Sequence, residues 1–444
     1  MLIEEIRVQG YKSLVDATLH VRPLTLLAGT NSSGKSSIMQ PLLLIKQTME
    51  ANYNPAGALV LNGAHVQADT AGDLMAAIGK SKAKQLLIGI TGSYNRGETS
   101  VKRSFELAYH VDGANFLVSY QQSQSMGWPD GPRKTLITPD STWDSMHSQL
   151  DPKRQKQYSL KNNFGHVQMR NGFLVNSVSD KEGNLVVVFK TTIQIDKVLS
   201  TLLHIPGLRN KAERTYLPTL FQDSVKGTFD LYVAGIIVQW QQQENTKELY
   251  KLNDYLYRLG LTDSITAKVK NANDVELSVS RLPAGSRGKP RKADMVNIAD
   301  VGIGVSQVLP IVVALIAAQE GQLVYVEQPE LHLHPRAQVV MAELLAEAAN
   351  RGVRVIVETH SSLLLLTVQT MVAEGEMKPE DVGLHWFSRD AKGATTVRFE
   401  QPDENGAYGD WPEDFGDVEL EAKRRYLDAI GQRRAQRQAG KATA

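Results

Sequence analysis

The sequence predicts an α/β fold that is built from two separated segments of the chain. In residues 24–49 an aliphatic run is followed by a glycine-rich loop and then by a helical pattern. A helix, strand, helix, strand pattern follows in residues 300–361. Between the two segments the periodicity is first strand-like and then helical, so we expect a mixed β and helical insertion.

Length, charge and cysteine content limit the possible functions. The 444 residues suggest two or three domains, or one domain that carries a large insertion. Lysine and arginine total 49 and aspartate and glutamate 48, so the formal charge is only +1. Such a chain has no global field to attract nucleic acid or an acidic membrane. The absence of cysteine excludes disulfides and cysteine-ligated zinc or iron–sulfur centres.

Hydropathy predicts a soluble cytoplasmic protein without a membrane segment. Near the N-terminus, Glu4 and Glu5 stand where a secretory signal would need basic residues. The longest apolar run, Leu309 to Ala318, has ten residues. This is about half the length that spans a bilayer as a helix.

The N-terminal segment predicts strand, turn, strand, loop and helix. Aliphatic and β-branched residues cluster in Ile3 to Val8 and again in Leu24 to Ala28. A helical spacing then extends from Lys35 to Met49. Pro41 lies inside that helix, where it removes one backbone hydrogen bond and favours a kink.

The strongest motif is GTNSSGKS, Gly29 to Ser36, which matches G-x-x-x-x-G-K-[ST] between a predicted strand and a predicted helix. Gly29 and Gly34 let backbone N–H groups approach phosphates without obstruction. Lys35 supplies positive charge to the β- and γ-phosphates, and Ser36 supplies a hydroxyl ligand to Mg²⁺. We therefore predict ATP and Mg²⁺ as cofactors. The predicted nucleotide-binding residues here are Gly29, Asn31, Ser32, Ser33, Gly34, Lys35, Ser36 and Ser37.

The middle of the chain predicts antiparallel strands followed by helices. Apolar residues alternate at Phe105, Leu107 and Tyr109, and Leu185 to Phe189 form an apolar run. Residues 121–163 are rich in Gln, Ser, Lys, Asp and Pro, which predicts a long exposed loop or partial disorder. Further on, one helical face and its C-terminal cap are formed by Leu249, Leu252, Leu256, Leu259 and Gly260.

Two basic stretches lack apolar periodicity. Arg281 to Lys292 has five basic residues and no acid, and the tail from Lys423 has seven lysines or arginines against one aspartate. Each could follow nucleic-acid phosphates. A solvated basic loop remains an equally good interpretation.

The segment LVYVEQPELHLHP, Leu323 to Pro335, begins as a buried parallel strand and reaches Glu327 at the carboxyl edge of the sheet. An acid there can hold the water shell of Mg²⁺, so we predict Glu327 and Ser36 as the metal site. An ordinary core strand that ends in acids is the alternative. The segment resembles a Walker B strand with Glu in the usual Asp position.

A third segment, VRVIVETHSS, Val353 to Ser362, predicts another buried strand, with Glu358, Thr359, His360 and Ser361 at its end. A neutral histidine in this place can donate a hydrogen bond to a γ-phosphate. A lone histidine is more often structural, but here it comes one helix after the strand that ends in Glu327.

Together the three segments resemble the ABC-type ATPase heads of the RecF, SMC and OLD group, which implies a split head of the P-loop NTPase class with a mixed β and helical insertion. Five stretches look like the bacterial AAA-type ATPases that carry a DUF3696 region: EQPELHLHP, ETHS, DVGIGVSQVLPIV, IPGLRNKAERTY and WPEDFGD. The implied organisation is residues 1–85 and 295–400 for the two parts of the head, 86–294 for the insertion and 401–444 for a C-terminal extension with a basic tail.

The resemblance implies that two heads pair around ATP, as a homodimer or a higher homo-oligomer. Gly302, Gly304 and Ser306 would then contact the γ-phosphate of the opposite protomer, although a transporter-type LSGGQ is absent. Heads of this group act in DNA repair, chromosome maintenance and, among OLD-like members, anti-phage defence. No nuclease is recognisable in this chain, so DNA or a separate nuclease or toxin effector is the implied partner.

Gln328 departs from the group, because the residue after the Walker B acid is usually the glutamate that activates water. An amide cannot accept a proton, so the general base must be Glu330, Glu358 or His360, or hydrolysis must be slow. The predicted catalytic set is Glu327, Gln328, Glu330 and His360. The same substitution favours the alternative function, an ATP-switched scaffold with slow turnover.

Two further signals are weak. His332 and His334 form an H-x-H pair, but the resembling families place a D-loop at the dimer seam there. Gln67 is a candidate Q-loop glutamine on the strength of its residue type alone. A transporter ATPase is disfavoured by the missing LSGGQ and by the long insertion.

Overall fold

The computed structural model describes residues 1–53, 57–78, 81–97, 99–127, 132–149, 155–156, 164–170, 172–179, 185–189, 193–219, 221, 225–281, 294–409 and 424–431. The basic stretch therefore lies outside the described residues from position 282 onward, and so does WPEDFGD. Of the basic tail, only residues 424–431 are described. No helix in these ranges has the length and hydropathy needed to cross a membrane.

A six-stranded sheet of order β13-β17-β18-β3-β19-β20 carries the predicted nucleotide site at one edge. Its strands are β3 (Leu24–Gly29), β13 (Leu203–Ile205), β17 (Leu323–Glu327), β18 (Arg354–Glu358), β19 (Val382–Arg389) and β20 (Thr395–Glu400). The first five are parallel and β20 is antiparallel to β19. All six residues of β3 are buried, as expected for a strand covered on both faces. The predicted α/β class is confirmed.

Successive side chains of β3 enter two different hydrophobic cores. Leu26 belongs to a core that includes residues of α8 (Ile303–Ala317) and α9 (Pro335–Asn350). Leu27 belongs to a core that includes Ile38 and Leu42 of α1 (Lys35–Glu50). This alternation follows from the two-residue period of a strand. It fixes α1, the helix that begins at the predicted phosphate loop, on one face of the sheet.

A second six-stranded sheet is antiparallel and has the order β2-β1-β6-β7-β8-β9. Its strands are β1 (Leu2–Tyr11), β2 (Leu14–His20), β6 (Gln85–Arg96), β7 (Thr99–Asp112), β8 (Asn115–Met126) and β9 (Arg133–Ile137). The predicted alternation in β7 is confirmed, since Phe105, Leu107 and Tyr109 are all buried. This sheet joins N-terminal strands to strands of the predicted insertion.

The prediction of a long loop over residues 121–163 is wrong for its first part. Residues 121–126 belong to β8, β9 follows, and α3 covers Trp143–His147. The polar composition of residues 121–126 predicted a loop, but β8 is a strand whose polar side chains Gln121, Ser123 and Ser125 are buried. Gln121 is buried and bonds both the N–H and the C=O of Leu174, at 3.1 and 3.2 Å.

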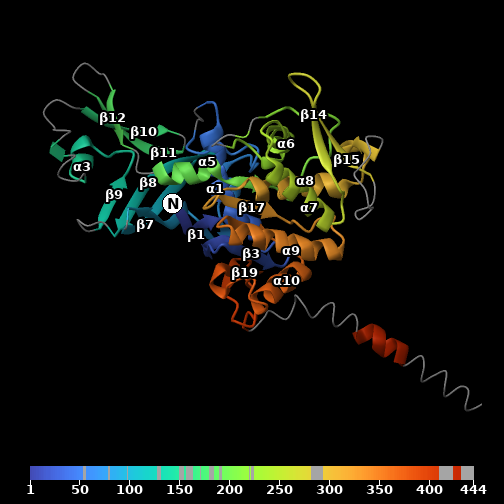
Figure 1. The fold of residues 1–444 in the computed structure, drawn as a ribbon. Helices are drawn as coiled ribbons and strands as arrows, with labels where there is room; N and C mark the ends of the chain where they lie inside the picture. The colour runs from blue at the N-terminus through green and yellow to red at the C-terminus, as the bar shows by residue number, and fades with distance from the viewer. Residues whose placement is uncertain are drawn as a thin grey trace, which may run out of the picture.

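The rest of the insertion contains two small sheets and a helical part (Figure 1). Its larger elements are β10 (Phe164–Arg170), β11 (Phe173–Ser179), β12 (Leu185–Phe189), α5 (Ile193–Thr201), α6 (Val233–Gln242), α7 (Thr246–Arg258), β14 (Ile265–Val269), β15 (Val275–Ser280) and β16 (Met295–Asn297). Short elements are α2 (Ala71–Leu74), β4 (Ala77–Ile78), β5 (Ser81–Lys82), η1 (Phe229–Tyr232), η3 (Ile298–Asp300) and η4 (Pro379–Asp381). The predicted leucine face is confirmed in α7, where Leu252 and Leu256 are fully buried.

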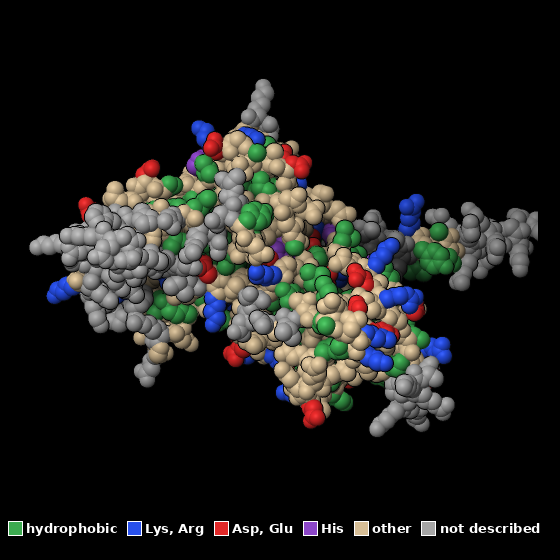
Figure 2. Space-filling model, turned by 90° about the horizontal axis from the view of Figure 1, so that it is seen from above, with side chains coloured by type: hydrophobic (Ala, Val, Ile, Leu, Met, Phe, Trp, Pro, Cys, Tyr) green, Lys and Arg blue, Asp and Glu red, His purple; other side chains and the backbone are tan. Residues whose placement is uncertain are grey.

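Helix α10 (Ser362–Ala373) packs beside α9, and both lie near the lower part of Figure 1. The short helix over residues 424–431 stands away from the rest of the molecule at the lower right. Seen from above, basic and acidic side chains are interspersed over the visible face, in keeping with the balanced formal charge (Figure 2). The division of the chain into the four ranges given above stays a prediction. One strand crosses its boundaries, since β13 lies within the predicted insertion but pairs with β17 of the head.

Candidate functional site

The phosphate-loop motif forms a tight turn between β3 and α1 in which two positions require glycine. Gly29 has a φ of 138°, and a Cβ there would lie 2.1 Å from the carbonyl oxygen of Phe387 on β19. Gly34 has a φ of 102°, and its Cβ would lie 2.6 Å from Thr395 Oγ1. Left-handed backbone and close approach both exclude larger residues. The loop is therefore shaped by strands that lie far away in the sequence.

Side chains of β19 and β20 form hydrogen bonds to the main chain of the phosphate loop. Arg389 donates from Nε to the carbonyl of Ser32 at 2.9 Å, and Thr395 donates to the carbonyl of Ser33 at 2.7 Å. Ser33 is fully buried, and its hydroxyl has no hydrogen-bond partner among the described residues. An orphaned hydroxyl in a loop of N–H donors fits a bound phosphate. Sequence reasoning missed Arg389 and Thr395, because they contact the loop only in the tertiary structure.

Lys35 lies inside the loop. Its ammonium group donates to the carbonyls of Gly29 and Thr30 at 3.1 and 2.8 Å. Burial lowers the pKa of Lys35, while Glu358 and Glu330 oppose that shift. The group is held where a phosphate would approach the loop. Ser36 and Ser37 follow at the start of α1, and Asn31 and Ser32 are exposed at the tip of the loop.

Two carboxylates lie next to each other at the carboxyl edge of the sheet. Glu327 ends β17 and Glu358 ends β18, and the two are directly paired in the parallel register. Adjacent strands are separated by about 4.8 Å, so the two acids influence each other. Sequence reasoning named Glu358 only as one possible base, whereas the structure places it in the middle of the site.

The environments of these two acids shift their pKa values in opposite directions. Burial alone would raise the pKa of Glu327, but hydrogen bonds from His204 at 3.2 Å and from the Gly207 N–H at 3.0 Å lower it. Burial raises the pKa of Glu358, and the neighbouring Glu327 adds to that shift. Ser36 and Lys35 partly oppose it. Glu327 is therefore the more strongly ionised acid of the pair.

Glu330 is part of the framework around His360. Its two carboxylate oxygens accept from the His360 N–H at 2.6 Å and from the Thr359 hydroxyl at 3.0 Å. Burial raises the pKa of Glu330 in spite of these bonds. Burial also lowers the pKa of His360, and Lys35 adds to that effect. Glu330 thus fixes the main chain at His360, and the lowered pKa favours a neutral imidazole.

Gln328 sits in a strained backbone position. Its φ is 45°, and its N–H donates to the carbonyl of Glu358 at 2.7 Å. The buried Arg209 donates from Nη2 to the carbonyl of Glu327 at 2.7 Å and reaches that of Gln328 at 3.4 Å. Burial lowers the pKa of Arg209 to about 10. Within the described residues, its Nε and Nη1 have no partner. Arg209 lies in the IPGLRN stretch, which drew attention only through resemblance.

The other predicted residues lie apart from the loop. Ser306 donates to the carbonyl of Ile303 within α8, and the start of that helix also contains Gly304. Gln67 is exposed in a short bridge with Asn62.

The H-x-H pair has a structural arrangement. His334 caps α9 by accepting from the Arg336 N–H at 3.3 Å, and His332 has a φ of 65°. Within the described ranges, no group of three or more His, Asp or Glu side chains is arranged to hold a metal ion. The pair is thus accounted for by the turn and the cap.

Two family models match overlapping parts of the chain, between residues 1 and 366. A family model described as "AAA ATPase domain" matches residues 1–223. A second, described as "AAA domain, putative AbiEii toxin, Type IV TA system", matches residues 204–366. No curated protein matches the chain.

Three solved structures illustrate the structural comparison. An SMC head bound to the C-terminal winged-helix domain of ScpA is 13% identical, with a TM-score of 0.47, covering 90% of this chain and 98% of that one. The SMC head domain from Thermotoga maritima is 11% identical, with a TM-score of 0.39 and the same coverage. An SMC head with an extended coiled coil, bound to a ScpA domain from Pyrococcus furiosus, is 12% identical, with a TM-score of 0.45, covering 97% and 99%.

The glycine-shaped loop, the buried lysine and the acids at the sheet edge define a P-loop ATPase with an α/β head. The first family model covers 223 of the 444 residues, just over half of the chain. The chain belongs to the AAA ATPase domain family. Nucleotide binding follows from this membership.

Proposed function

We propose that this ATPase binds ATP together with Mg²⁺ and that Glu327 and Glu358 divide the chemistry between them. The opposite pKa shifts of the two paired acids support this division. The ionised Glu327 and the hydroxyl of Ser36 suit the metal, and the ion would neutralise charge on the phosphates. Glu358 has a raised pKa and lies beside Lys35, which suits a proton acceptor.

The other residues of the site would orient the reactants. Neutral His360, whose main chain is bonded to Glu330, would donate from its imidazole to the γ-phosphate. Arg209 holds the main chain at Glu327 and Gln328, so it would keep the metal-binding carboxylate in place. Gln328 has no carboxylate to offer, and turnover should therefore be slow.

We infer that two heads pair around ATP, as a homodimer or a higher homo-oligomer. The start of α8 is exposed at Gly302 and Ile303, and Ser306 bonds only within its own helix among the interactions of the described residues. This leaves the helix start available to the nucleotide of an opposite protomer. The arrangement agrees with the resemblance to ABC-type heads, on which Gly304 and Ser306 were assigned.

We propose that the ATP-dependent assembly acts on DNA or controls a separate nuclease or toxin effector. Its role would be phage defence or DNA maintenance. The description of the second matched family names a toxin and a type IV toxin–antitoxin system, which favours an effector as the partner. Gln328 supports the alternative, a scaffold that is switched by ATP and hydrolyses very little. Both functions share the ATP-dependent assembly and differ in turnover.

Steady-state hydrolysis and light scattering test the proposal. The wild type with ATP and Mg²⁺ should form a dimer and turn over well below the median enzyme rate of about 10 per second. Lys35→Ala should lose binding and assembly together. Ser306→Arg should keep ATP affinity while losing the dimer. A wild type that binds no ATP, or a Ser306→Arg variant that assembles normally, would contradict the corresponding part of the proposal.

A further inference from the structure

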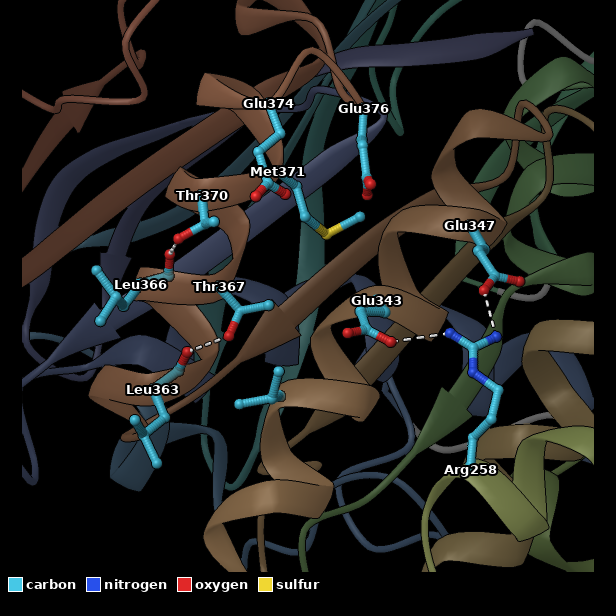
Figure 3. Close-up of a pocket in the computed structure, with 11 residues that line it drawn as sticks. Arg258, Glu343, Glu347, Leu363, Leu366, Thr367, Thr370, Met371, Glu374 and Glu376 are labelled. Carbon is cyan, nitrogen blue, oxygen red and sulfur yellow. Dashed lines mark hydrogen bonds and ion pairs between the residues drawn. The ribbon is translucent and has the colours of Figure 1, made fainter.

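A groove of about 520 Å³ opens between α10, α9 and α7 (Figure 3). One wall is formed by α10, including Leu363, Leu366 and Thr370. Leu366 is 58% exposed, so the wall presents an apolar side chain to solvent. The opposite wall comes from α9, with Arg258 of α7 at its end.

The groove is strongly acidic. Four glutamates line it, namely Glu343, Glu347, Glu374 and Glu376, against a single arginine. Arg258 is already paired with Glu343 at 2.9 Å and with Glu347 at 2.6 Å. Glu374 and Glu376 have no ion-pair partner among the described residues and point into the groove from the end of α10 (Figure 3). An occupant should therefore be basic and partly apolar.

The chain itself carries such a segment. Residues 424–431 form a short helix in which Tyr426 is 67% and Leu427 64% exposed. At 3.6 residues per turn, Tyr426, Leu427 and Ile430 fall within about 100° of one another, and Arg424 and Arg425 lie on either side of that face. The segment is seen between grey atoms at the right of Figure 2, with green and blue side chains. Tyr426 and Leu427 of this face are thus exposed in the part of the chain that the structure describes.

The tether makes this pairing intramolecular. Just before the undescribed residues 410–423, Gly406 packs on α10, where its carbonyl accepts from Gln369 Nε2 at 3.0 Å. Gln369 and the groove-facing Leu366 share this helix, so the chain leaves from the helix that forms the wall. Fourteen residues, 410–423, lie between 409 and 424, and a chain of this length can extend to about 50 Å. A helix is only about 10 Å across, so the reach is ample.

We propose that the acidic groove is the docking site for the basic helix at residues 424–431 of the same chain. Tyr426 and Leu427 contact Leu366, and the flanking arginines face Glu374 and Glu376. A short tether raises the local concentration of the helix at the groove, so modest contacts suffice. The proposal does not depend on the assignment of the nucleotide site.

Cross-linking in the full chain tests this directly, because the sequence has no cysteine. The variant Thr370→Cys with Ala429→Cys places one thiol in the groove wall and one beside the apolar face of the helix. A short bis-maleimide should join these two thiols at least about tenfold faster than the thiols of a control variant, Asp112→Cys with Ala429→Cys. Asp112 lies at the end of β7 in the antiparallel sheet. Peptide mass spectrometry of the digested product identifies the joined residues.

Charge reversal separates docking from chance encounter. Glu374→Lys with Glu376→Lys should slow the cross-link about tenfold, and adding Arg424→Glu with Arg425→Glu should restore it. Mixing isotopically heavy and light chains distinguishes the occupant, since docking within one chain gives no mixed product. In an equal mixture, docking between two copies would give about half mixed product, and that result would assign the groove to a second copy and overturn the proposal. A cross-link no faster than the Asp112 control would also overturn it.

Discussion

Nδ1 of His65 and Nδ1 of His204 lie 2.9 Å apart in the interior of the protein. The other ring nitrogen of His65 lies 3.3 Å from Glu50 on α1, and that of His204 lies 3.2 Å from Glu327 on β17. One proton is shared between the two Nδ1 atoms and His204 Nε2 can donate to Glu327, whereas His65 Nε2 lies close to Glu50 without a hydrogen bond. The row of four side chains therefore links the helix that begins at the phosphate loop to the acid proposed for Mg²⁺.

Replacing His65 by Leu should destabilise the fold, because it removes the partner of buried His204 and a close neighbour of Glu50. Loss of buried hydrogen-bond partners costs about 1–3 kcal/mol. Urea unfolding measures the change in the free energy of unfolding. His20→Leu is the matched control, since His20 and Glu5 form an exposed pair 3.6 Å apart. That pair should contribute less than about 1 kcal/mol, and equal losses in both variants would contradict the role of the buried row.

The identity of the general base can be decided by hydrolysis rates. Glu358→Gln should lower kcat by a factor of about 100 to 10,000, the usual effect of losing a positioned base. Gln328→Glu should change kcat little, because Glu358 already supplies the proton acceptor; a clear rise in kcat would show instead that the missing carboxylate at position 328 limits hydrolysis. Rapid-quench and steady-state assays with ATP and Mg²⁺ measure both effects.

Glu330→Gln supplies the comparison for that experiment. The amide can still accept from the His360 N–H, so the loss of kcat should be smaller than for Glu358→Gln. The pH profile gives a second readout. Because the pKa of Glu358 is raised, kcat should increase with pH through a midpoint above its ordinary value of about 4.5. A profile that is unchanged in Glu358→Gln would exclude this acid as the base.

Gly29→Ala should be far more destabilising than an ordinary glycine substitution. The new Cβ would lie 2.1 Å from the backbone of Phe387, so β3 and β19 would have to separate. We expect a loss above about 3 kcal/mol in the free energy of unfolding. Gly113→Ala is matched in having a positive φ of 58°, but nothing lies within 4 Å of its Cβ. Backbone strain alone should then cost about 1–2 kcal/mol, and thermal melts compare the two.

Acid should destabilise the protein partly through His385. Burial lowers the pKa of this histidine to about 3, with His20 and Arg22 adding to the shift, and its Nε2 accepts from the His20 N–H at 2.9 Å. Below pH 6.5 the unfolded chain binds a proton at this side chain that the folded protein does not bind. Stability is therefore fully present above pH 6.5 and falls as pH decreases, by at most about 2 kcal/mol at pH 5.

His385→Leu tests this pH dependence. Between pH 7 and pH 5 the free energy of unfolding should fall about 2 kcal/mol less in the variant than in the wild type. Denaturant titrations at each pH give the two slopes. Parallel slopes would show that His385 does not contribute. The absolute stability of the variant is a separate quantity, since it also loses the acceptor for the His20 N–H.

The sequence by itself determined the features that are encoded in contiguous residues. The phosphate loop needs two glycines, a lysine and a serine at fixed spacing, and a strand and a helix on either side, all within residues 24–50. The buried strands that end in Glu327 and Glu358 were evident as apolar runs. Local periodicity failed in β8, because its inward polar side chains are satisfied by distant backbone groups such as those of Leu174.

Only the tertiary structure decided what the acids can do. Glu327 and Glu358 have the same side chain and similar positions, so sequence reasoning left the base open among several residues. His204 and the Gly207 N–H, more than a hundred residues from Glu327, keep it ionised, whereas Glu358 is buried beside it. A pKa depends on the solvent, charges and hydrogen bonds around a group, and these are set by folding.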